Sequence, residues 1–136
     1  DLKNELKEIQ QITVQRTKDK KLRDFQTKLA NLSWLDPASG SGNFLTETYI
    51  SIRRLENEVI KALQRGQITF GFNESSPIHV SIDQFYGIEI NDFAVTVAKT
   101  ALWIAESQMM EETKNIVYGV ACFIHADFDR FCPVNT

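Results

Sequence analysis

The stretch from Trp34 to Asn43 constrains the fold of this chain more than any other. A short apolar piece, Trp34-Leu35, runs into a turn that reads Asp36-Pro37-Ala38-Ser39-Gly40-Ser41-Gly42-Asn43. Its Pro, Gly and Ser residues permit neither a continuing strand nor an early helix. Apolar residues then recur at helical spacing, at Leu45, Tyr49, Ile52, Leu55, Val59 and Leu63. The sequence therefore predicts a strand, a glycine-rich turn and a helix that ends with Gly66 as its C-cap.

A second unit of the same kind follows this helix. Residues 66–84 contain Gly, Asn, Ser and Pro, which predicts a long link with one short extended piece at 68–70. Phe85 to Ile90 is typical of a buried strand, and Asn91 is the expected N-cap of a helix that ends at about Met110. Residues 116–124 are rich in Val and Ile and predict a third strand. This alternation predicts an α/β fold with a parallel sheet and right-handed crossovers.

Residues 1–31 are expected to form a helical lead-in to a domain that comprises residues 32–136. Two amphipathic helices are indicated by apolar residues three and four positions apart, which are Leu2, Leu6 and Ile9, then Leu22, Phe25, Leu29 and Leu32. Between these two sets lies a charged patch of Arg16, Lys18, Lys20, Lys21 and Arg23. A contact with a nucleic-acid backbone and a solvated helix face are both compatible with this patch.

Composition limits the classes of protein to which the chain can belong. Its 136 residues, 43% of them hydrophobic, fit one globular domain. No apolar run approaches the roughly 20 residues that span a bilayer, and the first residues do not resemble a signal peptide. We therefore expect a cytoplasmic protein with no membrane partner. The net charge of −3 indicates that most of any DNA-binding surface lies outside these residues.

The cysteines and histidines do not indicate a metal site. Cys122 and Cys132 belong to no CxxC pair and to no set with zinc spacing, so buried free thiols are expected. His79 and His125 have no partner pattern around them and are expected to be an ordinary loop residue and an ordinary strand-end residue.

Two features fall where an open parallel sheet binds its ligand, beyond the carboxyl ends of the strands. They are the turn from Asp36 to Asn43 and the acid Glu89, and we expect them to meet in one crevice. Gly40 and Gly42 let the backbone turn tightly and approach a ligand without a Cβ in the way. A carboxylate at the end of the second strand can accept hydrogen bonds from both hydroxyls of a ribose. Adenosine in some form is therefore the expected ligand.

Two common nucleotide-binding motifs do not fit the turn. A P-loop needs Lys after its last Gly, but no Lys follows Gly42 until Lys61. A dinucleotide site needs a third Gly where this chain has Leu45. Glu89 also lies 47 positions after Gly42, against the roughly 20 expected for a nicotinamide-binding unit.

The sequence from Asp36 to Leu45 closely resembles the motif D-P-A-C-G-S-G-N-F-L. This is the first motif of adenine-N6 DNA methyltransferases of bacterial restriction-modification systems. Ser39 stands where that family has Cys. Phe85 to Asn91 resembles the family's second motif, whose acid binds the ribose of S-adenosylmethionine. The resemblance thus implies a Rossmann-like parallel sheet of a class I methyltransferase, which is incomplete in this chain and preceded by helices.

The resemblance also implies a role for each motif residue. The turn cradles the methionine end of the cofactor, Glu89 holds the ribose hydroxyls, and Ile90 packs on the adenine. Asp127-Phe128 is the candidate for a third motif, which contacts the adenine amino group and ring. The implied cofactor-binding residues are Asp36, Pro37, Ala38, Ser39, Gly40, Ser41, Gly42, Asn43, Phe44, Glu89, Ile90, Asn91, Asp127 and Phe128.

The family transfers a methyl group from S-adenosylmethionine to the exocyclic nitrogen of a flipped-out adenine in DNA. Its fourth motif, [DNS]-P-P-[YFW], lines the adenine site, but this sequence contains no Pro-Pro. Cys132-Pro133 reverses the Pro-Cys order of cytosine-C5 methyltransferases, so a covalent cysteine mechanism is not indicated either. We therefore expect a cofactor-binding portion that stops before the catalytic motif and does not methylate DNA alone. Its expected partners are DNA and, as an open possibility, restriction-modification subunits.

Two alternatives stay open at this point. One is a class I methyltransferase that acts on RNA, a protein or a small molecule, although the Asn43-Phe44 pair favours the DNA group. The other is a non-catalytic module, a truncated product that binds cofactor weakly or serves only in assembly.

Overall fold

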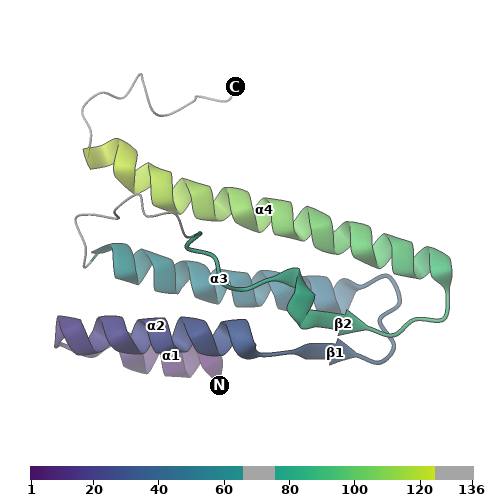
Figure 1. Ribbon diagram of the computed structural model, residues 1–136, viewed down its shortest axis with the longest axis horizontal. Helices are drawn as coiled ribbons and strands as arrows, with labels where there is room; N and C mark the ends of the chain where they lie inside the picture. The colour runs from purple at the N-terminus through teal and green to yellow at the C-terminus, as the bar shows by residue number, and fades with distance from the viewer. Residues whose placement is uncertain (66–75, 125–136) are drawn as a thin grey trace.

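The computed structural model describes residues 1–65 and 76–124 of the protein. The elements follow in the order α1 (Leu2–Gln10), α2 (Gln15–Asn31), β1 (Trp34–Asp36), α3 (Asn43–Arg65), a 3₁₀ turn η1 (Ile82–Gln84), β2 (Phe85–Gly87) and α4 (Asp92–Ile124) (Figure 1). Several sequence-based expectations lie outside the described residues, namely the Gly66 cap, the extended piece at 68–70, His125, Cys132 and the pair Asp127-Phe128.

The two strands pair in parallel, as the sequence predicted. Trp34 lies opposite Phe85, and Asp36 lies opposite Gly87. Helix α3 is part of the connection between the strands, so β1, α3 and β2 form the expected strand-helix-strand unit. Strand β2 ends at Gly87 and is shorter than the predicted Phe85–Ile90, because after Gly87 the chain hydrogen-bonds to the turn that follows β1 and no longer to a regular strand.

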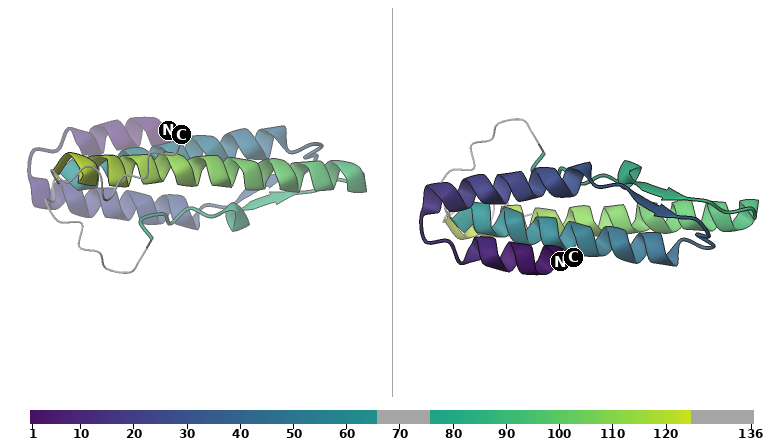
Figure 2. Two further views of the ribbon diagram at one scale, coloured as in Figure 1. Left: turned by 90° about the horizontal axis from the view of Figure 1, so that it is seen from above. Right: turned by 90° about the horizontal axis from the view of Figure 1, so that it is seen from below.

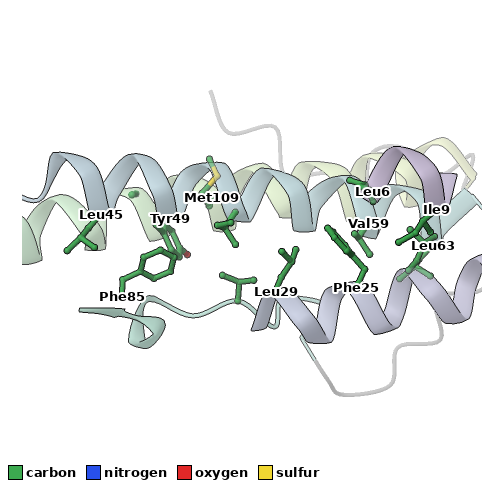
Figure 3. Close-up of a cluster of buried hydrophobic side chains, with 14 residues drawn as sticks. Leu6, Ile9, Phe25, Leu29, Leu45, Tyr49, Val59, Leu63, Phe85 and Met109 are labelled. Atoms are coloured by element: carbon green, nitrogen blue, oxygen red, sulfur yellow. The ribbon is translucent and has the colours of Figure 1, made fainter. Parts of the chain in front are cut away.

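Helix α3 lies at the centre of the molecule, between α4 on one side and α2 on the other (Figure 1). The views from above and below show the helices running nearly along one long axis, with the strands at one end (Figure 2). The two helices predicted within residues 1–31 are confirmed as α1 and α2. They share one apolar core with the rest of the chain (Figure 3), which contains Leu6, Ile9, Leu22, Phe25, Leu29, Leu45, Tyr49, Ile52, Val59, Leu63, Val80, Phe85, Ala105 and Met109.

An aromatic group holds the short strands against α3. The ring of Phe85 stacks on Trp34 of the neighbouring strand, with centroids 6.3 Å apart. Tyr49 of α3 meets the same Phe85 ring edge-on at 5.4 Å (Figure 3). Such pairs contribute about 0.5–1.5 kcal/mol each beyond the area that they bury. Burial also raises the pKa of the Tyr49 phenol, which therefore stays protonated at neutral pH.

Gln84 joins the entrances of the two strands. Its side-chain N–H donates to the carbonyls of Leu29 and Leu32, at 2.9 and 2.7 Å, where α2 ends just before β1. Its carbonyl accepts from the N–H of Ser81 at 2.8 Å and completes a capping box around η1. Because Gln84 directly precedes β2, these bonds help to set the register of β2 against β1.

The predicted third strand is wrong, because residues 116–124 continue α4 without a break. No Gly or Pro separates Met110 from Ile116, and side chains at helical spacing, such as Ala98, Ala105, Met109 and Thr113, are buried. The β-propensity of a Val- and Ile-rich run depends on its context, and here the run follows a helix that is already packed up to Thr113. Although α4 has 33 residues, neither it nor any other described helix has an apolar stretch that could span a membrane.

Candidate functional site

The turn after β1 and the segment after β2 meet at the carboxyl ends of the two strands, as expected. The N–H of Ile88 donates to the carbonyl of Asp36 at 2.9 Å. The carbonyl of Ile88 in turn accepts from the N–H of Ser39 at 3.0 Å and from its hydroxyl at 3.3 Å. These bonds extend the parallel ladder into the turn, so that the two motifs lie side by side.

Glu89 is the residue that ties the two motifs together. Its Oε2 accepts from the N–H of Gly40 at 2.9 Å, across 49 positions of sequence. Its Oε1 accepts from the N–H groups of Ile90 and Asn91, at 2.8 and 2.9 Å. The bond from the Asn91 N–H, helped by those from Gly40 and Ile90 and opposed by desolvation, lowers the pKa of the carboxyl below its ordinary value. Glu89 is therefore an anion at neutral pH.

The hydrogen-bonding capacity of Glu89 limits what else it can hold. A carboxylate offers about four acceptor positions, and three N–H groups already point at this one. One ribose hydroxyl can therefore be accepted without any rearrangement. A second hydroxyl would have to replace one of the three backbone donors.

The two glycines of the turn have different surroundings. Both have positive φ, +51° at Gly40 and +80° at Gly42, which L side chains rarely adopt. A Cβ on Gly40 would meet nothing within 4 Å, so this backbone is open to an approaching ligand. A Cβ on Gly42 would lie 2.7 Å from the Cβ of Ala98 in α4. From the sequence, both glycines were expected to let the backbone approach a ligand. In the structure, Gly42 instead lies against Ala98 of α4.

Two residues of this site were missed from the sequence. A Cβ on Gly87 would lie 2.8 Å from the Ser39 side chain, so Gly87 lets the turn close over the end of β2. A glycine inside an otherwise apolar strand pattern signals such an approach. Ala98 is the small residue on which Gly42 packs, and nothing in its sequence context distinguishes it from other helix alanines.

Asp36 and Asn91 shape the backbone of the site. Asp36 Oδ1 accepts from the N–H of Ala38 at 3.1 Å, which stabilises the turn. Asn91 Oδ1 accepts from the N–H groups of Phe93 and Ala94, at 3.0 and 3.1 Å. This arrangement confirms Asn91 as the N-cap of α4. These two side chains thus hold the turn and the helix start in place.

The remaining motif residues lie at the surface of the same end. Pro37, Ala38, Ser41 and Asn43 are exposed. Three apolar side chains are open as well, with exposed fractions of 61% for Phe44, 97% for Ile90 and 78% for Phe93. The site therefore presents a carboxylate, a glycine-rich backbone and uncovered apolar surface within one region.

Comparison with known proteins places this arrangement among DNA methyltransferases. DNA methyltransferase A of Bacillus subtilis is 49% identical over 99 residues, which are 73% of this chain and 11% of that protein. A putative type II restriction enzyme and methyltransferase of Methanocaldococcus jannaschii is 30% identical over 110 residues, which are 74% of this chain and 9% of that protein. The chain therefore spans about a tenth of the length of these relatives.

A solved structure has a similar fold. It is that of the Type IIL restriction-modification enzyme MmeI in complex with DNA, with a TM-score of 0.65 and 38% sequence identity over 81% of this chain and 15% of that one. The described helices and the two-stranded parallel sheet are thus similar to a region of that enzyme, and the expected resemblance to restriction-modification methyltransferases is confirmed. Residues 12–125 match the family described as MmeI, DNA-methyltransferase domain, and the chain belongs to that family.

Proposed function

We propose that the glycine-rich turn and Glu89 bind S-adenosylmethionine, within the Rossmann-like class I domain of a DNA adenine-N6 methyltransferase. The observation that carries the proposal is the contact between Glu89 and the N–H of Gly40 at the carboxyl ends of two parallel strands. This is where open parallel sheets bind nucleotide-like ligands. The likeness to the MmeI methyltransferase domain supports methyl transfer over other uses of the same geometry.

The residues present fit this cofactor. S-adenosylmethionine supplies an electrophilic methyl group on a positively charged sulfonium. Glu89 is a preorganised anion with room for a ribose hydroxyl, and Gly40 leaves open space beside the backbone of the turn. Ile90 directly follows the acid and offers uncovered apolar surface for a purine ring. Asp36 to Asn43 would hold the methionine end, with Phe44 beside them.

DNA as the methyl acceptor rests on the relatives. Two of them carry methyltransferase names, and the MmeI enzyme was solved on DNA. The choice of the adenine amino group rests on the similarity of the turn to the adenine-N6 motif. The cytoplasm and restriction-modification partners are proposed on the same basis, and residues outside this chain would make most contacts with DNA.

Titration calorimetry with S-adenosylmethionine tests the proposed site. The chain should bind the cofactor, and Glu89→Ala should weaken binding by about ten- to a hundredfold, because a charged hydrogen bond to the ribose is lost. Glu8→Ala, which removes an exposed carboxylate of α1, is the matched control and should leave the affinity unchanged. A folded Glu89→Ala protein with wild-type affinity would exclude Glu89 from the site.

A second assay tests the expectation that these residues bind the cofactor but do not methylate DNA by themselves. These 136 residues contain no Pro-Pro motif to hold a flipped adenine in line with the sulfonium. Incubation with radiolabelled S-adenosylmethionine and adenine-containing duplexes should therefore give no labelled DNA, although the cofactor binds. Label transfer by these residues alone would show that the adenine site is built from parts of the chain that we have not assigned.

A further inference from the structure

A group of buried polar side chains lies inside the helical part of the molecule, away from the proposed cofactor site. We call it the inner polar cluster, and it consists of Gln26, Arg53, Glu56, Asn57 and Thr113. Each of these residues is at most 4% exposed. Burial of charge on this scale is costly unless every partner is well placed. The cluster therefore calls for a role beyond filling space.

Glu56 is the centre of this cluster. Its Oε2 accepts from Arg53 Nη1 at 2.5 Å, and its Oε1 accepts from Gln26 Nε2 at 2.9 Å. The guanidinium of Arg53 reaches further, to the hydroxyl of Thr113 on α4 at 2.7 Å. Three helices are thus joined through one carboxylate and one guanidinium.

The same carboxylate also holds backbone that belongs to no helix. Glu56 Oε1 accepts from the N–H of His79 at 2.6 Å, and both of its oxygens lie 3.3 Å from the N–H of Val80. Gln26 Nε2 donates to the carbonyl of Pro77 at 2.7 Å. The inner polar cluster therefore binds both ends of the segment from Pro77 to Val80.

This segment leads directly to the proposed site. Val80 is buried in the apolar core, and η1 begins two residues later, after its N-cap Ser81. Gln84, at the end of η1, fixes the start of β2 against the end of α2. Two residues after the end of β2, Glu89 accepts a hydrogen bond from the N–H of Gly40. The hydrogen bonds of Glu56, Gln84 and Glu89 thus follow one another along a single stretch of chain.

We propose that Glu56 is a positioning residue for cofactor binding, which acts by holding the backbone of Pro77 to Val80 so that β2 presents Glu89 to the glycine-rich turn. The inference rests on the proposed function for the identity of the ligand, but its geometry is independent of any ligand. Removal of the Glu56 carboxylate should loosen the contact between Glu89 and Gly40, even in variants that still fold.

A positioning role and a merely stabilising role predict different results. A buried ion pair can often be replaced by apolar residues of similar volume with little loss of stability. The backbone N–H groups of His79 and Val80, however, would then have no acceptor at this point. Arg53→Met with Glu56→Leu removes both the pair and the acceptor. Arg53→Met with Glu56→Gln removes the pair but retains an acceptor oxygen, so the two double variants are matched.

The experiment measures amide hydrogen exchange at Gly40 and Ile88, together with the affinity for S-adenosylmethionine. In the Leu variant we expect both amides to exchange at least about tenfold faster and the affinity to fall by about tenfold. The Gln variant should restore both values toward the wild type. Equal exchange and equal affinity in the two variants would overturn the proposal. The exposed pair Glu58 and Lys61 on the same helix is the control, and its removal should change neither value.

A second pair of variants keeps the test decisive if a double variant does not fold. His79→Pro deletes one backbone N–H that Glu56 accepts, and His79→Ala keeps it, while the exposed His79 side chain is lost in both. Faster exchange at Gly40 in the Pro variant alone supports the positioning role, and unchanged exchange in both overturns it. If the wild type fails to bind S-adenosylmethionine, the proposed function falls, but the exchange at Gly40 still tests Glu56.

Discussion

Glu56 and Glu89 perform the same chemical task in different surroundings. Each carboxylate accepts backbone N–H groups from a segment distant in sequence, at His79 and Val80 for Glu56 and at Gly40 for Glu89. Glu56 has no exposed surface and is paired with an equally buried arginine. Glu89 is partly open to solvent, and its three donors are all backbone groups.

The difference in burial predicts which substitution costs more stability. A buried carboxylate with a buried cation must keep all of its partners, since an unpaired charge inside the protein is expensive. A carboxylate at the surface is stabilised by its N–H donors and still has acceptor capacity for a ligand. We therefore expect Glu56→Ala, which leaves Arg53 buried without its anion, to reduce stability far more than Glu89→Ala does. The loss of cofactor affinity expected in variants that keep no acceptor at Glu56 is an indirect effect, whereas Glu89→Ala acts on binding directly.

The largest expected effect is that of Glu56→Ala on stability. The substitution leaves Arg53 buried without its anion, so the free energy of unfolding should fall by about 3–5 kcal/mol. Glu89→Ala should change it little. Urea denaturation of both variants measures the contrast. Equal losses of stability would remove the distinction between the two carboxylates.

Gly42→Ala should have the next largest effect, because it disturbs the turn that Glu89 contacts. The new Cβ would lie 2.7 Å from Ala98 Cβ at a φ of +80°. Overpacking and positive φ together should cost about 2–4 kcal/mol. Denaturation curves will show this loss, and Ala98→Gly in the same chain should recover part of it. Wild-type stability in the single variant would contradict the packing role of Gly42.

Gly40→Ala should cost less, about 1 kcal/mol, because only the positive φ is strained and the space beside Gly40 is open. Its effect should instead appear in binding, since the added methyl group would stand where a ligand approaches. Calorimetry should show a loss of affinity for S-adenosylmethionine that is larger than the small loss of stability would produce. Unchanged affinity would place the ligand elsewhere on the turn.

The smallest expected effect is a shift in the pH dependence of the Glu89 contact. Backbone hydrogen bonds lower the pKa of Glu89, so its stabilising contribution is present above the ordinary Glu value of about 4.3 and is lost only as pH falls through the lower, folded value. The amide resonance of Gly40, followed by NMR, should titrate with a midpoint below the ordinary pKa of a Glu side chain. A midpoint at or above that value would contradict an anion held by these three donors.

The sequence predicted the local elements around the site well, because their signals are local. Helical spacing of apolar residues indicated α1, α2 and α3, and a polar cap before Phe93 indicated the start of α4. Gly, Ser and Pro after Trp34-Leu35 indicated the turn. The order of strand, helix and strand was enough to expect parallel pairing and the meeting of Glu89 with the turn, which the structure confirms.

Other features were decided only by the tertiary structure. Residues 116–124 have the composition of a strand, yet they continue α4, a helix whose buried side chains recur at helical spacing up to Thr113. Gly42 was expected to let the backbone approach the ligand, but it packs against Ala98, which lies 56 positions away in sequence. Glu56 lies on a helix among other charged residues, and no local pattern shows that it is buried and holds the segment before β2. Such roles depend on which surfaces meet across the fold, and periodicity and composition along one stretch of chain carry no information about that.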